Sequence, residues 1–204
     1  MGRLSLPLAE AETTMDELVE KLRSASASGD SGAVRQLLAA GVDPNRPSSR
    51  GVPPLFEAMA YGHVDAVVAL LEGGADANYS NEHGGTALMA GAYFPDGRAL
   101  RALLAAGADI EAKDADGRNA LVIACQSGAA STVACLLEHG ASANELVGAT
   151  QTSPLVWAVY NDSHGAEVIG LLLSAGADPN SKDASGRTPK DHASVRNPDF
   201  LTLL

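Results

Sequence analysis

The sequence predicts an all-α solenoid made of one repeated two-helix unit, because two independent markers recur along its 204 residues with the same period. The glycines that follow a double leucine lie 33, 33, 33 and 36 residues apart, at Gly41, Gly74, Gly107, Gly140 and Gly176. The leucines in the other half of the unit lie 33, 33, 33 and 34 residues apart, at Leu22, Leu55, Leu88, Leu121 and Leu155. Such a period is typical of repeats that stack side by side.

Each unit is expected to contain two short helices and a turn. The first helix starts at a residue whose side chain can accept a free backbone N–H of the first turn: Thr86, Asn119, Ser153 and Thr188. Proline follows Ser153 and Thr188, at a helical position that needs no donor. The second helix ends at the repeated glycine, which can adopt the left-handed conformation that stops a helix. A polar segment then leads to the next unit as an extended hairpin.

Five full units and a shortened sixth account for most of the chain. They are expected to span 15–47, 48–80, 81–113, 114–147, 148–182 and 183–204 as a single domain, after a flexible leader at 1–14. The first unit carries Asp16 and Glu17 where later units have the helix-opening motif, which suits an N-terminal cap that meets water. The last unit ends in Phe200, Leu201, Leu203 and Leu204, and we expect this apolar end to pack back on the fifth unit as a C-terminal cap.

The helix-opening segments resemble those of the ankyrin-repeat family. They are Gly51 to Ala58 (GVPPLFEA), Gly84 to Leu88 (GGTAL), Gly117 to Ala124 (GRNALVIA) and Gly186 to Pro189 (GRTP). The resemblance extends from residue 15 to the end of the chain. It implies stacked helix-turn-helix units joined by β-hairpin loops, and partners that contact the hairpin tips and the exposed face of each first helix.

Composition and charge disfavour several classes of function. The formal charge is −11 and the 14 basic residues are scattered, so nucleic acid is not an expected partner. No apolar run reaches the length that spans a bilayer, and no signal peptide is recognisable, so we expect a cytoplasmic protein without a membrane association. Cys125 and Cys135 lack metal-ligand spacing and are expected to be small buried side chains.

The sequence also argues against an enzyme. The 5 histidines stand in separate turns, tips and loops, and no zinc-protease, phosphate-loop, dinucleotide or nucleophile-elbow motif is present. We therefore predict no catalytic residue, no cofactor and no metal ligand.

The candidate partner-binding residues follow from the repeat pattern. The positions five and six residues after the repeat leucine have no packing reason to be aromatic, yet they collect Tyr61, Tyr93, Phe94 and Tyr160, together with Gln126 and Asn161. Exposed tyrosines are enriched at the energetic centres of interfaces. The hairpin tips add Arg50, His83 and Arg118 as polar contacts.

The leading hypothesis is a monomeric interaction module that holds a client protein or peptide on its concave face, as a scaffold, adaptor or inhibitor. One alternative is a dedicated inhibitor of the immunity type that neutralises a basic toxin or enzyme, which the acidic charge would suit. Another is a ligand-binding or substrate-modifying protein with a site near Trp157 and His164. A third is a structural subunit that self-associates through Leu203 and Leu204.

Overall fold

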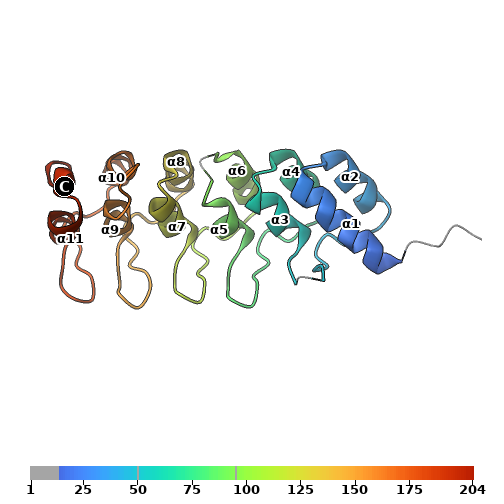
Figure 1. The fold of residues 1–204 in the computed structure, drawn as a ribbon, viewed down its shortest axis with the longest axis horizontal. Helices are drawn as coiled ribbons and strands as arrows, with labels where there is room; N and C mark the ends of the chain where they lie inside the picture. The colour runs from blue at the N-terminus through green and yellow to red at the C-terminus, as the bar shows by residue number, and fades with distance from the viewer. Residues whose placement is uncertain (1–13, 50, 95) are drawn as a thin grey trace, which may run out of the picture.

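The helices form a single row of antiparallel pairs in the computed structural model, which describes residues 14–49, 51–94 and 96–204 (Figure 1). Each helix packs on its partner within the pair and on the equivalent helix of the next pair. The pairs are α1 (Met15–Ser28) with α2 (Ser31–Ala39), α3 (Pro54–Ala60) with α4 (Val64–Glu72), α5 (Ala87–Gly91) with α6 (Arg98–Ala105), α7 (Ala120–Ser127) with α8 (Ala130–Glu138), α9 (Pro154–Val159) with α10 (Gly165–Ser174), and α11 (Pro189–Arg196) with the 3-10 helix η1 (Pro198–Thr202). The predicted helical solenoid is confirmed.

Helix starts follow the expected capping pattern at three of four positions. The side chains of Thr86, Asn119 and Thr188 accept backbone N–H groups from the residues three positions later. The prediction for Ser153 is wrong, because its side chain makes no capping hydrogen bond. Its hydroxyl instead accepts from the Ser181 hydroxyl of the next hairpin at 3.3 Å.

Helix ends follow the glycine pattern. The glycine after each second helix of the first five pairs has a φ between +85° and +92°, in the left-handed region that other residues rarely adopt: Gly41, Gly74, Gly107, Gly140 and Gly176. The turn therefore requires glycine at this position of each unit.

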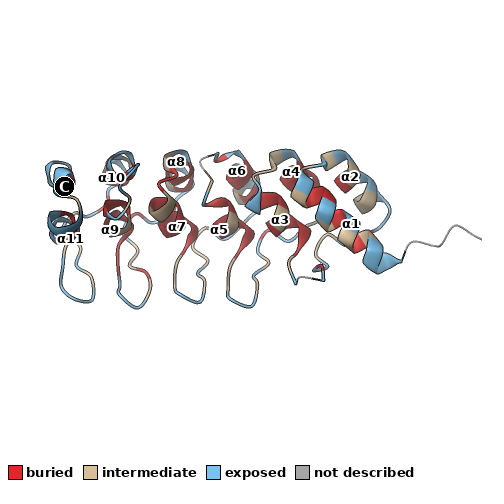
Figure 2. Ribbon diagram, in the orientation of Figure 1, coloured by how far each residue is buried: buried red, intermediate tan, exposed pale blue. Residues whose placement is uncertain are grey.

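The core is a continuous layer between neighbouring helix pairs (Figure 2). The repeat leucines are at most 2% exposed: Leu22, Leu55, Leu88, Leu121 and Leu155. Because each unit buries its apolar face only against its neighbours, these leucines stabilise the stack and are not available to a partner. Within residues 14–49, 51–94 and 96–204, no helix combines the length and the apolar character needed to span a bilayer.

The hairpin loops project from one side of the row (Figure 1). Their antiparallel pairing is limited to the isolated bridges Ser80–Thr86 and Val147–Thr152, so the described loops contain turns and no continuous β-strand. Neighbouring tips also bond to each other: Ala115 N–H donates to the His83 carbonyl at 2.8 Å, and Ala184 N–H donates to the Thr150 carbonyl at 2.9 Å. These bonds fix the spacing of successive tips.

Asparagine side chains join the turns of successive units. The amide groups of Asn45, Asn78 and Asn144 donate to Gly74, Gly107 and Gly176, and their oxygens accept from Asp76, Asp109 and Asp178. We call this series the asparagine ladder. At the remaining junction Glu111 stands in the asparagine position and accepts the Ser142 N–H at 2.7 Å. The ladder is therefore altered at one junction in the middle of the stack.

The two ends of the stack are closed in different ways. At the N-terminal end Thr14 and Glu17 form a reciprocal capping box at the start of α1. At the C-terminal end the ring of Phe200 is buried and packs against Gly165 of α10, where it leaves no room for a side chain. Leu203 nearby stays 42% exposed.

Candidate partner-binding surface

Three tyrosines are exposed along the surface between the first helices and the hairpin loops. Tyr61, Tyr93 and Tyr160 are 58%, 56% and 45% exposed, although large aromatic side chains are usually well buried. Each follows the last turn of a first helix: α3, α5 and α9. The repeat geometry therefore displays the three rings from equivalent parts of the stack.

Tyr93 borders a pocket of about 440 Å³ between α5 and the hairpins that precede and follow it, which we call the Tyr93 pocket. His83 and Arg118 line the same pocket, so three of the predicted contact residues meet there. Its apolar wall includes Phe56, Met89 and Ile123. An apolar floor with a few polar groups at the rim is the usual composition of a binding pocket.

Carboxylates hold the guanidinium of Arg118 in place. Its Nη2 lies 2.8 Å from Asp114 Oδ2 and 3.0 Å from Asp116 Oδ2. The hydrogen bond that the Arg118 guanidinium donates to the Asp114 carboxylate raises the pKa of Arg118 above its ordinary value. Asp116 is 74% exposed, so the rim of the Tyr93 pocket presents a carboxylate to solvent beside a neutralised arginine.

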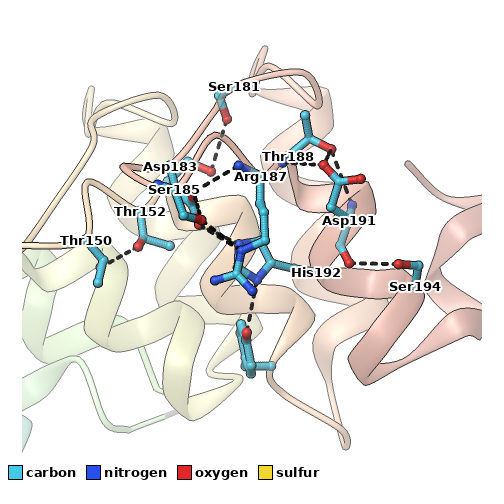
Figure 3. Close-up of polar contacts among 12 residues, drawn as sticks. Thr150, Thr152, Ser181, Asp183, Ser185, Arg187, Thr188, Asp191, His192 and Ser194 are labelled. Carbon is cyan, nitrogen blue, oxygen red and sulfur yellow. Dashed lines mark hydrogen bonds and ion pairs between the residues drawn. The ribbon is translucent and has the colours of Figure 1, made fainter.

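A second pocket of about 430 Å³ lies between α9 and the last hairpin, and we call it the Tyr160 pocket. Trp157 and Tyr160 line it together with Thr150, Asp183, Arg187 and His192. Figure 3 shows Asp183, Ser185 and Arg187 of the last hairpin close to His192 of α11. The indole Nε1 of Trp157 is buried and is the one buried side-chain N or O atom in the described residues without a hydrogen-bond partner.

A chain of hydrogen bonds orients Tyr160. Its hydroxyl lies 3.0 Å from His192 Nδ1, and His192 Nε2 lies 2.8 Å from Asp183 Oδ2. The side chains of His192 and Asp183 are each 5% exposed. The Ser185 hydroxyl and the backbone N–H of Arg187 lower the pKa of Asp183 far below its usual range, so that Asp183 stays ionised. Because His192 is enclosed, this series positions the tyrosine ring and offers no accessible imidazole to a substrate.

The family model for ankyrin repeats (3 copies) matches residues 22–114 and 90–183. The chain belongs to the ankyrin-repeat family. No curated protein matches the sequence.

Solved ankyrin-repeat structures superimpose on about nine tenths of the chain. The ankyrin repeat domain of Bcl-3, described as a unique member of the IkappaB protein family, is 31% identical with a TM-score of 0.80, over 90% of this chain and 84% of that one. An ankyrin repeat domain from Acinetobacter baumannii AYE is 27% identical with a TM-score of 0.80, over 89% and 94% of the two chains. The ankyrin repeat protein EF0377 is 25% identical with a TM-score of 0.81, over 91% and 96%.

The other predicted contact residues lie outside the two pockets. Tyr61 stacks on His63, with ring centroids 6.1 Å apart. Phe94 is half-buried, and its carbonyl accepts the Thr132 hydroxyl. The side-chain amide of Asn161 donates to the Gln126 carbonyl at 2.9 Å, and its side-chain oxygen accepts backbone N–H groups within its own loop. The polar atoms of this side chain therefore bond within the ankyrin stack. Arg50 lies outside the described residues.

The pocket residues that the sequence analysis missed include Asp183, Arg187 and His192. A signal for two of them exists, since Asp183 to Arg187 (DASGR) matches Asp114 to Arg118 (DADGR) at the equivalent hairpin. The expected pairing of Trp157 with His164 is not found. Trp157 lines the Tyr160 pocket, whereas His164 precedes α10 and is not among the lining residues.

The described residues offer little for metal or thiol chemistry. No group of three or more His, Cys, Asp or Glu side chains among them is arranged to hold a metal ion. Cys125 and Cys135 are free and buried, and burial raises the pKa of both thiols. Protonated, enclosed thiols are poor nucleophiles.

Proposed function

We propose that this ankyrin-repeat chain binds a protein partner on the concave face formed by its first helices and hairpin tips, and that it has no catalytic activity of its own. Ankyrin repeats are generally protein–protein interaction modules. The observation that carries the proposal is the pair of pockets at Tyr93 and Tyr160, which place exposed aromatic rings beside polar hairpin groups on one surface.

The packing of the surface supports a binding role. Tip-to-tip backbone hydrogen bonds and the hydrogen-bonded series behind Tyr160 order the surface before any partner arrives. A preformed surface loses little conformational entropy on association, so more of the contact energy appears as affinity. The exposed rings supply the contact area that interfaces commonly use at their energetic centres.

We further propose that the protein acts as a monomer in the cytoplasm. The buried unpaired thiols of Cys125 and Cys135 suit a reducing compartment. The ring of Phe200 at the apolar end is buried against the fifth helix pair and is therefore not available for self-association. Light scattering over a range of concentrations tests the monomer, and a mass that rises with concentration would contradict it.

Site-specific photo-cross-linking tests the binding surface. A photoreactive phenylalanine analogue replaces Tyr93 or Tyr160, and matched control chains carry it at the exposed positions Ala105 of α6 and Glu167 of α10. We expect adducts to one protein, identified by mass spectrometry, from positions 93 and 160 in cells that make the protein. Adducts of equal yield from positions 105 and 167, or none from positions 93 and 160, would overturn the proposal.

A further inference from the structure

The Tyr93 pocket and the Tyr160 pocket are built in the same way. In each, a tyrosine stands five residues after the repeat leucine, Leu88 or Leu155. In each, the next hairpin carries an Asp-x-x-x-Arg segment whose aspartate and arginine both line the pocket. The pockets also have nearly equal volumes, about 430 and 440 Å³. They are two copies of one site on one repeating surface.

The intervening repeat lacks this site. Gln126 stands in place of the tyrosine and is half-buried, and the following hairpin, 147–152, carries no arginine. The two pockets are therefore two repeats apart. Since packed helices lie about 8–10 Å from one another, the pockets are about 16–20 Å apart along the stack.

This separation matches a short stretch of extended polypeptide. An extended chain advances about 3.3 Å per residue, so the two pockets are about five or six residues apart along such a chain. Side chains of an extended chain alternate between two faces. A spacing of six places both side chains on the same face, toward the ankyrin surface, whereas a spacing of five turns one of them away.

The charge at the rim of the Tyr93 pocket indicates which residues of the bound segment should lie next to its apolar side chains. Asp114 and Asp116 share the single guanidinium of Arg118, and Asp116 is largely exposed at the rim. The whole chain carries a formal charge of −11. A lysine or arginine in the bound segment would be attracted by this rim, and an acidic residue would be repelled.

We propose that the partner presents an extended segment with two large apolar side chains six residues apart, one in each pocket, and with lysine or arginine next to the residue in the Tyr93 pocket. This inference rests on the proposed function, because it names the chemistry of the partner at the same surface. A helical segment advances only about 1.5 Å per residue, so it would need its two apolar side chains about 11 residues apart, and the spacing therefore distinguishes the two conformations.

Selection from a phage-displayed library of random 12-residue peptides tests the proposal, with the folded full chain as the target. We expect enriched peptides to share two large apolar residues six positions apart and at least one nearby lysine or arginine. Enrichment of peptides with a single apolar residue, with helical spacing or with an acidic consensus would overturn the proposal. So would the absence of any enriched sequence.

Fluorescence anisotropy with the enriched peptides then assigns the two pockets. We expect affinity to fall about tenfold in Tyr93→Ala and in Tyr160→Ala. Glu167→Ala is the control, because Glu167 of α10 is exposed and lines neither pocket. Tyr160→Phe, which keeps the ring and removes the hydroxyl bonded to His192, should lose less affinity than Tyr160→Ala, and the difference separates lost ring contact from lost ring orientation.

The cross-linking experiment and the peptide selection test the two proposals independently of each other. Cross-linking from positions 93 and 160 without a six-residue spacing among selected peptides would reject the extended segment and keep the binding surface. Peptides with the expected spacing and tyrosine dependence, without any cross-linked protein in cells, would reject the proposed cellular partner and keep the chemistry of the two pockets.

Discussion

Replacing Glu111 with asparagine is expected to stabilise the protein. Glu111 occupies the one junction at which the asparagine ladder is altered, and an ionised carboxylate cannot donate to the Gly140 carbonyl as Asn78 donates to Gly107. Glu111 also lies beside Glu145, and the amide of Asn119 donates to both carboxylates. Burial and the neighbouring Glu145 raise the pKa of Glu111, so its ionisation in the folded state is unfavourable.

The expected gain is the balance of three contributions. A new hydrogen bond to Gly140 contributes about 1 kcal/mol, and loss of the Asn119 bond to Glu111 costs about the same. Removing one of two adjacent carboxylates contributes up to about 1 kcal/mol. The net stabilisation is therefore about 1 kcal/mol at most, which raises the Tm of a domain of this length by about 2–4 °C.

The gain should depend on pH. Because the pKa of Glu111 is raised in the folded state, its contribution to stability is complete only below its unfolded pKa of about 4.3 and is lost as pH rises through the folded pKa. The parent protein is therefore penalised most at neutral pH. The advantage of Glu111→Asn should therefore be larger at neutral pH than in mildly acidic buffer.

Thermal denaturation followed by circular dichroism measures this difference. Asn78→Ala is the matched control, because it removes both ladder hydrogen bonds of a neighbouring junction and should lower stability by about 1–2 kcal/mol. A Glu111→Asn variant that melts below the parent at every pH would refute the ladder argument. A gain that does not change with pH would refute the assignment to the carboxylate pair.

Three further changes test the fold. Leu121→Ala should lower the free energy of unfolding by about 3 kcal/mol in urea denaturation, because Leu121 is fully buried; a loss below about 1 kcal/mol would contradict its place in the core. Thr188→Ala should lower the free energy of unfolding by about 1 kcal/mol, because the capping box is lost. Ser153→Ala should lower it clearly less, and an equal decrease would show that the Ser153 side chain caps α9. Cys125 should not react with a thiol reagent at pH 8 until urea unfolds the chain, because burial raises its thiol pKa; rapid labelling of the folded protein would contradict this.

Part of the candidate site could be predicted from the repeat alone. The repeat leucine lies at the start of helices α3, α5 and α9, so counting five or six residues from it finds the exposed positions of Tyr61, Tyr93 and Tyr160. The hairpin residues His83 and Arg118 follow from the predicted positions of the hairpin tips. Which of these residues share a pocket cannot be predicted in this way, because each pocket joins a helix of one repeat to the hairpin of the next.

Contacts between neighbouring repeats also decide the roles of side chains that the sequence of one repeat does not explain. The side chain of Ser153 has the right type and place for a cap, yet it pairs with Ser181 28 residues later. His192 looks like an isolated histidine in the sequence, yet it connects Tyr160 and Asp183. Asn161 looks like a free surface amide, yet its side chain bonds to the Gln126 carbonyl of the preceding repeat.

The sequence by itself determined the period, the helix pairs, the glycine turns and the buried leucines, because each of these depends on residues within one unit and is repeated. Only the tertiary structure decided which polar side chains meet, since residues about 30 positions apart become neighbours when units stack. A repeating pattern specifies the common contacts of every junction. The residues that break the pattern acquire their roles from the particular neighbours that the stack places beside them.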